Sequence, residues 1–216
     1  MNTSIRYICV GDTETGGLPN KTKQAFYDVA LCEVAFVVID IVKMSVVDEY
    51  TTIVAPYKDG LEYNPQALSV NKLTMEQIQA GKPVQQVYKD LVELFTKYRN
   101  SRAGTVLAGH NFLPFDMPFF VGMFEFCKGN VWDYVTFVED TMKLGWYRAT
   151  EQENYKLGTC CRLEGVELVD AHRALTDTRA NAELLMKYIE YLRGNGGGGF
   201  DARAIKSNFR DTFELV

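Results

Sequence analysis

The chain has 216 residues, 47% of them hydrophobic and 24% charged, which suits one globular domain. Its 23 basic and 28 acidic residues give a net charge of −5, whereas a protein that holds nucleic acid by phosphate contacts alone is expected to be basic. The longest apolar run, residues 34–39, is too short for a membrane span, and the first residues lack a signal-peptide pattern. We therefore expect no membrane association.

The N-terminal third is predicted to form strands. Residues 5–10 are an apolar run that breaks at Gly11, and residues 29–41 and 45–54 are two further β-rich runs. Short turn-like segments separate the three runs, so we predict that they pair as an antiparallel meander.

Helical patterns dominate the rest of the chain. Thr74 is a suitable N-cap for a helix over 75–80 that Gly81 ends, and Pro83 begins a longer amphipathic helix. The remaining predicted elements are strands at 105–108 and 134–138 and helices at 114–127, 141–147, 157–163 and 174–192. This order predicts an α/β fold with a mixed sheet flanked by helices.

Three segments are distinguished by composition. We predict a folded domain over residues 1–193, a glycine-rich linker over 194–199, and a C-terminal tail over 200–216 that alternates charged and aromatic residues. The tail is expected to dock back on the domain, to bind a partner or to stay loose. The five cysteines include no CxxC pair, which favours reduced thiols and a cytoplasmic location.

The first candidate for chemistry lies at the end of the first predicted strand. Asp12 and Glu14 are two positions apart, so on a strand their side chains point to the same face. Neighbouring carboxylates repel each other, and a divalent cation such as Mg²⁺ or Mn²⁺ removes that repulsion. The alternative is a solvated acidic turn.

Two more acidic positions follow. Asp116 falls near the start of the helix predicted over 114–127, where a carboxylate is also favoured for purely structural reasons. His172 and Asp177 are five residues apart, about 140° out of phase on a regular helix. If both serve one site, His172 must come from the loop before the last helix and Asp177 from its first turns.

These clusters resemble the three motifs of the DEDDh branch of the DEDD exonucleases, which includes the epsilon subunit of bacterial DNA polymerase III (DnaQ-like), ribonuclease T and oligoribonuclease. The matching residues of the three motifs are Asp12-Thr13-Glu14-Thr15 with Gly17-Leu18, His110-Asn111 with Phe115-Asp116, and His172, Ala174 and Asp177. Weaker matches are Asn64-Pro65, Ala67, Thr74, Asp140-Thr141, Leu157 and Cys161.

The resemblance covers about residues 5–193, and it departs from the family at two positions. Gly11 stands where a bulky apolar residue is usual, and Gly16 stands where threonine is common. We expect Gly16 to add backbone freedom beside the site.

The resemblance implies an RNase H-like fold with a five-stranded mixed sheet and a 3′→5′ exonuclease that releases nucleoside 5′-monophosphates. Asp12, Glu14, Asp116 and Asp177 would hold two divalent cations, Mg²⁺ or Mn²⁺, for two-metal hydrolysis. His172 would take the proton of the attacking water, since histidine exchanges a proton near neutral pH.

Several residues are candidates for contacts with the nucleic acid. Backbone amides around Thr13 and Thr15 would bind the terminal nucleotide, and Leu18 would press on the last base or else anchor its loop. Phe112 or Phe115 would stack a base, with core packing expected for at least one of them. Asn111 would contact a base or a phosphate. Glu33, an acid within an apolar run, needs a hydrogen-bonding partner if it is buried, either beside the site or at a sheet edge.

Three functions remain to be compared. An active exonuclease explains the complete set of acids with His172, whereas a catalytically silent nucleic-acid-binding or polymerase-associated module of the same fold does not require them. A small-molecule phosphohydrolase is disfavoured because the chain has no glycine-rich phosphate loop.

The expected partner is the 3′ end of DNA or RNA, in single-stranded form. Two bound cations would offset most of the net negative charge, so the site meets phosphate without a basic face. A homodimer, and a polymerase or other protein bound through the C-terminal tail, are left open.

Overall fold

A mixed five-stranded sheet lies at the centre of the computed structural model, which describes residues 5–149, 151–168 and 172–194. The strands are β1 (Tyr7–Thr15), β2 (Leu31–Asp40), β3 (Ser45–Ile53), β4 (Thr105–Gly109) and β5 (Val135–Asp140). Across the sheet their order is β3-β2-β1-β4-β5. The first three strands pair antiparallel, while β4 runs parallel to both β1 and β5. The predicted meander and the predicted fold class are both confirmed.

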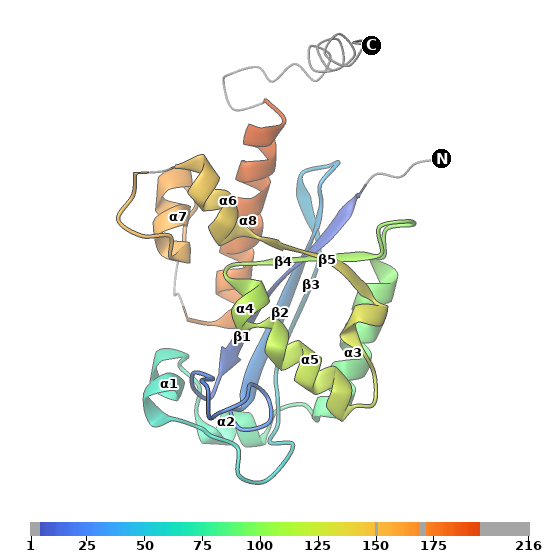
Figure 1. The fold of residues 1–216 in the computed structure, drawn as a ribbon, viewed down its shortest axis with the longest axis vertical. Coiled ribbons are helices and arrows are strands. Elements are labelled where there is room, and N and C mark those ends of the chain that lie inside the picture. Colours follow the sequence, from blue (N-terminus) through green and yellow to red (C-terminus); the bar gives the residue numbers. More distant parts are fainter. Residues whose placement is uncertain (1–4, 150, 169–171, 195–216) are drawn as a thin grey trace, which may run out of the picture.

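Helices cover both faces of this sheet (Figure 1). They are α1 (Pro65–Val70), α2 (Met75–Gln79), α3 (Val84–Lys97), α4 (Phe112–Phe115), α5 (Met117–Phe126), α6 (Thr141–Arg148), α7 (Leu157–Glu164) and α8 (Ala174–Leu192), with a 3-10 turn at Val131–Asp133. On one face, α8 packs through Ala182 and Leu185 against Val10 of β1. On the other, α3 and α5 pack through Phe95 and Phe120. The result is a three-layer α/β domain.

The interior position of β2 in the sheet explains its composition. All ten of its residues are buried, because β2 lies between β1 and β3 and has helices on both faces. A strand buried on both faces carries a continuous apolar run in place of alternation. The apolar run over 34–39, too short for a membrane span, is therefore part of an interior strand of the sheet. None of the helices in the described part of the chain has the length and apolar character needed to cross a membrane.

The first strand is longer than the sequence pattern predicts. β1 does not end before Gly11 but continues through Thr15, because residues 11–15 remain paired with β2. Gly11 lies opposite Phe36, and a Cβ at this position would come within 2.5 Å of the Phe36 ring. The aromatic side chain thus fills from β2 the volume that a bulky residue at position 11 would occupy. Asp12 and Glu14 consequently lie on a regular strand.

The helix predicted over 114–127 is also different in the structure. It is divided into α4 and α5, and Asp116 lies at the junction as the N-cap of α5. Asn111, before α4, adopts a left-handed conformation with φ of 59°. This sharp turn follows β4 directly, and it brings Asp116 back towards the end of β1.

The connection from β3 to β4 contains one helix, α1, that the sequence pattern does not predict. Asn64 caps α1 by accepting a hydrogen bond from the backbone N–H of Gln66. The predicted cap at Thr74 is confirmed, with Gln77 completing a capping box. Gly16 is not a point of added freedom, because its N–H and C=O are hydrogen-bonded to Ala30 and Asn64, and a Cβ there would collide with the carbonyl of Glu62.

The cysteines and the C-terminal segment were also described from the sequence. The cysteines in the described residues are free, and Cys160 and Cys161 pack in a buried cluster with Leu184 and Tyr188. Except for Gly194, the predicted linker and tail, residues 194–216, lie outside the described residues.

Candidate active site

The candidate site lies where β1 and β4 separate. The two strands are paired only at Cys9 with Leu107 and Val10 with Ala108, and β1 then continues alone on that side. In α/β sheets, ligands bind at the carboxyl ends of the strands, next to such a change in strand order. The structure places the predicted acids around this point.

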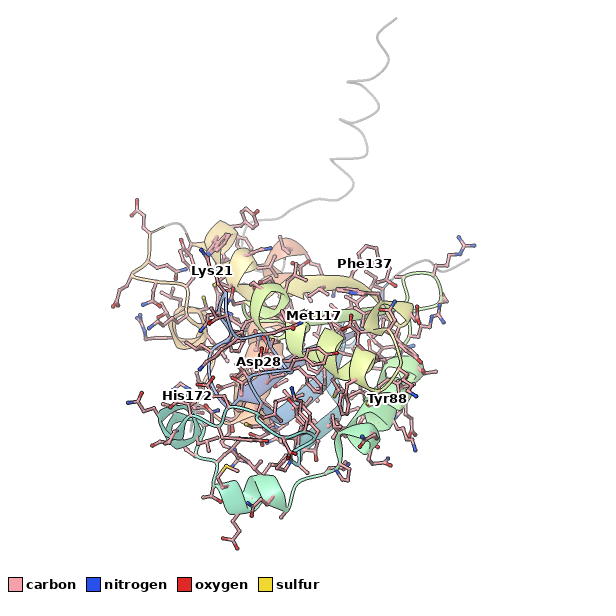
Figure 2. The ribbon with its side chains drawn as sticks, turned by 60° about the horizontal axis from the view of Figure 1, so that its bottom comes forward. Lys21, Asp28, Tyr88, Met117, Phe137 and His172 are labelled. Atoms are coloured by element: carbon pink, nitrogen blue, oxygen red, sulfur yellow. The ribbon has the colours of Figure 1, made fainter. Side chains whose placement is uncertain are left out.

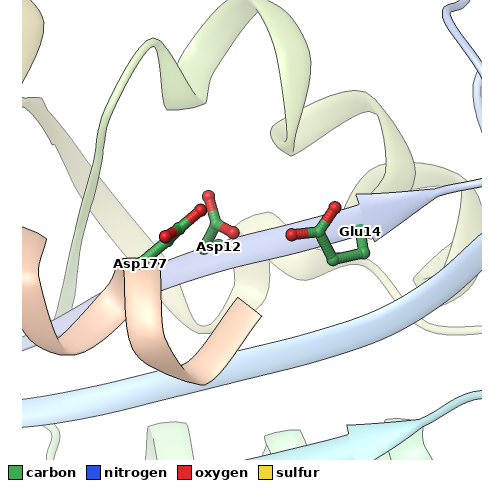
Figure 3. Close-up of side chains that lie close together, drawn as sticks. All are labelled: Asp12, Glu14 and Asp177. Atoms are coloured by element: carbon green, nitrogen blue, oxygen red, sulfur yellow. The ribbon is translucent and has the colours of Figure 1, made fainter. Parts of the chain in front are cut away.

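Three carboxylates converge on the face of β1 that α8 covers. Asp12 and Glu14 project from the same face of the strand, and Asp177 projects from the first turn of α8 (Figure 3). One carboxylate oxygen from each lies within 4.8 Å of the other two. Oxygen ligands at such separations are suited to a hard divalent cation.

Asp116 reaches the same point from the opposite layer. It is 2% exposed, and one of its carboxylate oxygens accepts a 2.6 Å hydrogen bond from the Thr13 hydroxyl. Thr13 alternates with Asp12 and Glu14, so its side chain lies on the other face of β1. Asp116 is not part of the group of three within 4.8 Å, yet its charge raises the pKa of Asp12.

The electrostatics of the cluster are unfavourable without added positive charge. Burial, followed by the charge of Asp177, raises the pKa of Glu14 to about 8. Burial raises the pKa of Asp12 well above its usual range, and the charges of Asp116 and Glu14 add to the effect. Burial also raises the pKa of Asp116 to about 7 against the opposing hydrogen bonds from Thr13. Such a cluster favours a cation that replaces the protons.

The two histidines differ in their environments. His110 is partly buried, with one ring nitrogen 3.0 Å from the Thr141 hydroxyl and the other 2.7 Å from the Tyr155 carbonyl, and burial lowers its pKa. His172 is exposed and lies on the loop before α8 (Figure 2). As the spacing predicted, His172 precedes α8, while Asp177 belongs to its first turn.

The backbone of His172 is tied to the acidic cluster. It adopts a left-handed conformation with φ of 71°, and its N–H donates to the Asp177 carboxylate at 3.1 Å. This hydrogen bond opposes the effect of burial on the pKa of Asp177, which is nevertheless raised. The exposed histidine is thereby held beside one of the clustered acids.

The candidate nucleic-acid contacts are distributed unevenly. Leu18 is 74% exposed at the end of the segment that follows β1. Phe112 is buried in the core, as expected for one of the two phenylalanines, whereas Phe115 is partly buried. The Thr13 hydroxyl and backbone N–H are both hydrogen-bonded to Asp116, and the Thr15 hydroxyl donates to the Gly17 carbonyl, so both hydroxyl donors are already used within the protein.

Some residues near the site were not identified from the sequence as its neighbours. Arg173 forms a salt bridge with Glu33, which supplies the partner that a buried Glu33 was expected to need. The Asn71 side chain donates a hydrogen bond to the Thr15 carbonyl, and the charge of Lys72 lowers the pKa of Asp177. An acid within an apolar run is unusual, so Glu33 could be recognised from the sequence as a residue that needs a partner. No local sequence pattern identifies Asn71 or Lys72 as neighbours of the site.

The chain is similar in sequence to known exonuclease and DNA polymerase proteins. A family model described as an exonuclease, RNase_T, matches residues 9–185. The DNA polymerase III PolC-type proteins of Bacillus subtilis and Bacillus cereus are 32% and 34% identical over 105 and 99 residues. These matches cover 47% and 45% of this chain but only 7% of each polymerase.

Solved structures share the fold at low sequence identity. The zinc-bound complex of E. coli exonuclease I with single-stranded DNA has a TM-score of 0.70 and 17% identity, covering 95% of this chain and 43% of that one. A full-length 3′-exonuclease has a TM-score of 0.65 and 16% identity, covering 87% and 83% of the two chains. At these identities, the structural matches show a common RNase H-like fold.

Proposed function

Because the chain belongs to the RNase_T exonuclease family, we propose that it is a metal-dependent 3′→5′ exonuclease of the DEDDh type. The observation that carries this proposal is the convergence of Asp12, Glu14 and Asp177, with Asp116 beside them, at the carboxyl end of β1. The substrate is the single-stranded 3′ end of DNA or RNA, and the product is a nucleoside 5′-monophosphate.

The residues present fit a pair of divalent cations, Mg²⁺ or Mn²⁺. All four proposed ligands offer carboxylate oxygens, and the pKa values of Asp12 and Glu14 are raised by burial and then by repulsion from neighbouring acids, both of which a bound cation would offset. Asp12, Glu14, Asp116 and Asp177 would hold the ions. When bound, two such ions lower the pKa of water and stabilise charge on the attacking and leaving oxygens.

His172 is proposed as the general base. Its exposed position lets it reach a water molecule at the scissile phosphate, while the hydrogen bond from its N–H to Asp177 keeps it near the ligands. Histidine can accept a proton near neutral pH, which suits the deprotonation of water. No covalent intermediate between enzyme and substrate is required.

The proposal is tested with a 5′-labelled single-stranded oligonucleotide and Mg²⁺ or Mn²⁺. A ladder of labelled fragments that shorten one nucleotide at a time is expected, because hydrolysis removes residues from the 3′ end. Matched DNA and RNA oligonucleotides then establish the preferred substrate. No shortening of either polymer would contradict the proposal and would favour a catalytically silent binding module.

Metal binding is expected to stabilise the protein more at pH 8.5 than at pH 6. Folding raises the pKa of Glu14 from 4.5 to about 8. Between these two pH values the metal-free folded protein keeps a proton on Glu14 that the unfolded chain has lost. Stability contributed by that proton falls as pH rises from about 4.5 to 8. Bound cation favours the ionised carboxylate, so the increase in Tm on adding Mn²⁺ should grow across this range.

Thermal melts with and without Mn²⁺, at constant ionic strength, measure this effect. The Glu14→Gln variant should show a smaller Mn²⁺ increment with a weaker pH dependence, and the dependence that remains comes from Asp12 and Asp116, whose pKa values are also raised. An increment that is constant, or that shrinks as pH rises, would contradict cation binding by this cluster.

Leu18 is proposed to contact the terminal base. Because its side chain is 74% exposed, Leu18→Ala should leave Tm nearly unchanged. We expect kcat/KM on an oligonucleotide to fall about tenfold, as for a lost contact worth about 1.4 kcal/mol. Val42→Ala, which truncates another exposed aliphatic residue, is the control and should retain full activity. Equal rates for Leu18→Ala and the native chain would leave Leu18 only an anchoring role.

A further inference from the structure

Glu33 is a second glutamate beside the acidic cluster. It lies on β2 as the cross-strand partner of Glu14, and it is 3% exposed. Residues directly opposite each other on antiparallel strands project to the same face, where like charges are destabilising. The charge of Glu33 accordingly contributes to the raised pKa of Glu14, after burial and the charge of Asp177.

Arg173 compensates this buried charge. Its Nε and Nη2 atoms donate to the two Glu33 oxygens at 3.2 and 2.9 Å, which is a bidentate geometry. The charge of Arg173 also lowers the pKa of Glu14, against the effect of its acidic neighbours. Removing one partner of a buried ion pair leaves an uncompensated charge and is strongly destabilising.

Glu33 also holds the start of α8. The N-cap of this helix is Arg173, whose side chain makes no capping hydrogen bond. The first helical N–H, that of Ala174, donates to Glu33 Oε2 at 3.3 Å. A carboxylate from β2 thus satisfies one of the N–H groups that every helix leaves unpaired at its N-terminus.

The Arg173 end of the Glu33–Arg173 ion pair lies next to the proposed catalytic residues in the sequence. Arg173 directly follows His172 and precedes Asp177 by four residues, and the His172 N–H is bonded to the Asp177 carboxylate. We propose that Glu33 and Arg173 are positioning residues that fix His172 and Asp177 against β1 and keep Glu33 itself from binding the metal. The inference rests on the proposed function for its catalytic consequence.

The test compares Arg173→Ala with the double variant Arg173→Ala/Glu33→Gln in the full chain. Arg173→Ala should lower Tm and reduce kcat about 10- to 100-fold, the usual range for residues that orient metal ligands, with little change in KM. The double variant removes the uncompensated charge and keeps an acceptor for the Ala174 N–H. It should therefore recover most of the Tm and part of kcat.

Arg179→Ala is the matched control. Arg179 forms an equally bidentate pair with Glu49 of β3 from the same helix, but both residues are largely on the surface. Its loss should leave kcat and KM unchanged. Calorimetric titration with Mn²⁺ alone should show that Glu33→Gln binds the metal as the native chain does.

Two results would overturn the proposal. A large rise in KM for Arg173→Ala, with no recovery of Tm in the double variant, would make Arg173 a phosphate contact. Loss of Mn²⁺ affinity in Glu33→Gln that Arg173→Ala does not share would make Glu33 a metal ligand. An inactive native chain would contradict the proposed function. Tm and Mn²⁺ affinity are measured without nucleic acid, so they would still test whether Glu33 and Arg173 hold the start of α8 in place.

Discussion

Asp12→Asn is expected to abolish strand shortening, with a loss in kcat of at least about 10³-fold, while the protein becomes more stable without metal. Metal ions supply several kcal/mol of transition-state stabilisation in phosphoryl hydrolysis, and about 4 kcal/mol corresponds to that factor. The stability gain follows because burial and neighbouring acids raise the pKa of Asp12, so the charged form is costly in the fold. A neutral amide removes that cost.

The two effects have separate measurements. Single-turnover shortening of a labelled oligonucleotide gives the rate, and a thermal melt at pH 8 without divalent ions gives the stability. Asp59→Asn, which changes an exposed aspartate, should alter neither. Undiminished shortening by Asp12→Asn would refute the assignment of this site.

His172→Ala is expected to reduce kcat by 10²- to 10⁴-fold, the range for loss of a general base. Mn²⁺ affinity should persist, because the side chain is exposed and the hydrogen bond to the Asp177 carboxylate comes from the backbone N–H of His172.

Calorimetry and a double variant distinguish this role from a structural one. If His172 acts only in the metal-dependent hydrolysis step, its loss should cost nothing once Asp12 is removed. Asp12→Asn/His172→Ala should then be no slower than Asp12→Asn alone. Loss of Mn²⁺ binding in His172→Ala would instead indicate that the residue maintains the metal site, which would argue against proton transfer.

The chain spans about 7% of the length of the PolC-type polymerases it resembles and 43% of the exonuclease I chain. Its activity as an independent enzyme and its activity as part of a polymerase assembly are therefore separate proposals. The tail over 200–216, with its aromatic residues, lies beyond the family match, which ends at residue 185. Pull-down with and without this tail compares the two.

Local patterns in the sequence predicted most of the elements, apart from α1 and the division between α4 and α5, and they marked the candidate acids of the site. These are local signals: a helix over 174–192, a cap at Thr74, and two carboxylates at i and i+2 all follow from periodicity and short-range chemistry. The separation of His172 from the helix that carries Asp177 also followed from helical phase alone.

Tertiary structure decided what depends on contacts between distant segments. Pairing with β2 carries β1 past Gly11, and Phe36 fills the space that the glycine leaves. Asp116 comes to the end of β1 from the opposite face of the sheet because the chain turns sharply at Asn111. Arg173 and Glu33 are 140 residues apart, and only folding brings the guanidinium to the carboxylate. Burial then sets the pKa values, since desolvation depends on the surrounding layers and not on neighbours in the sequence.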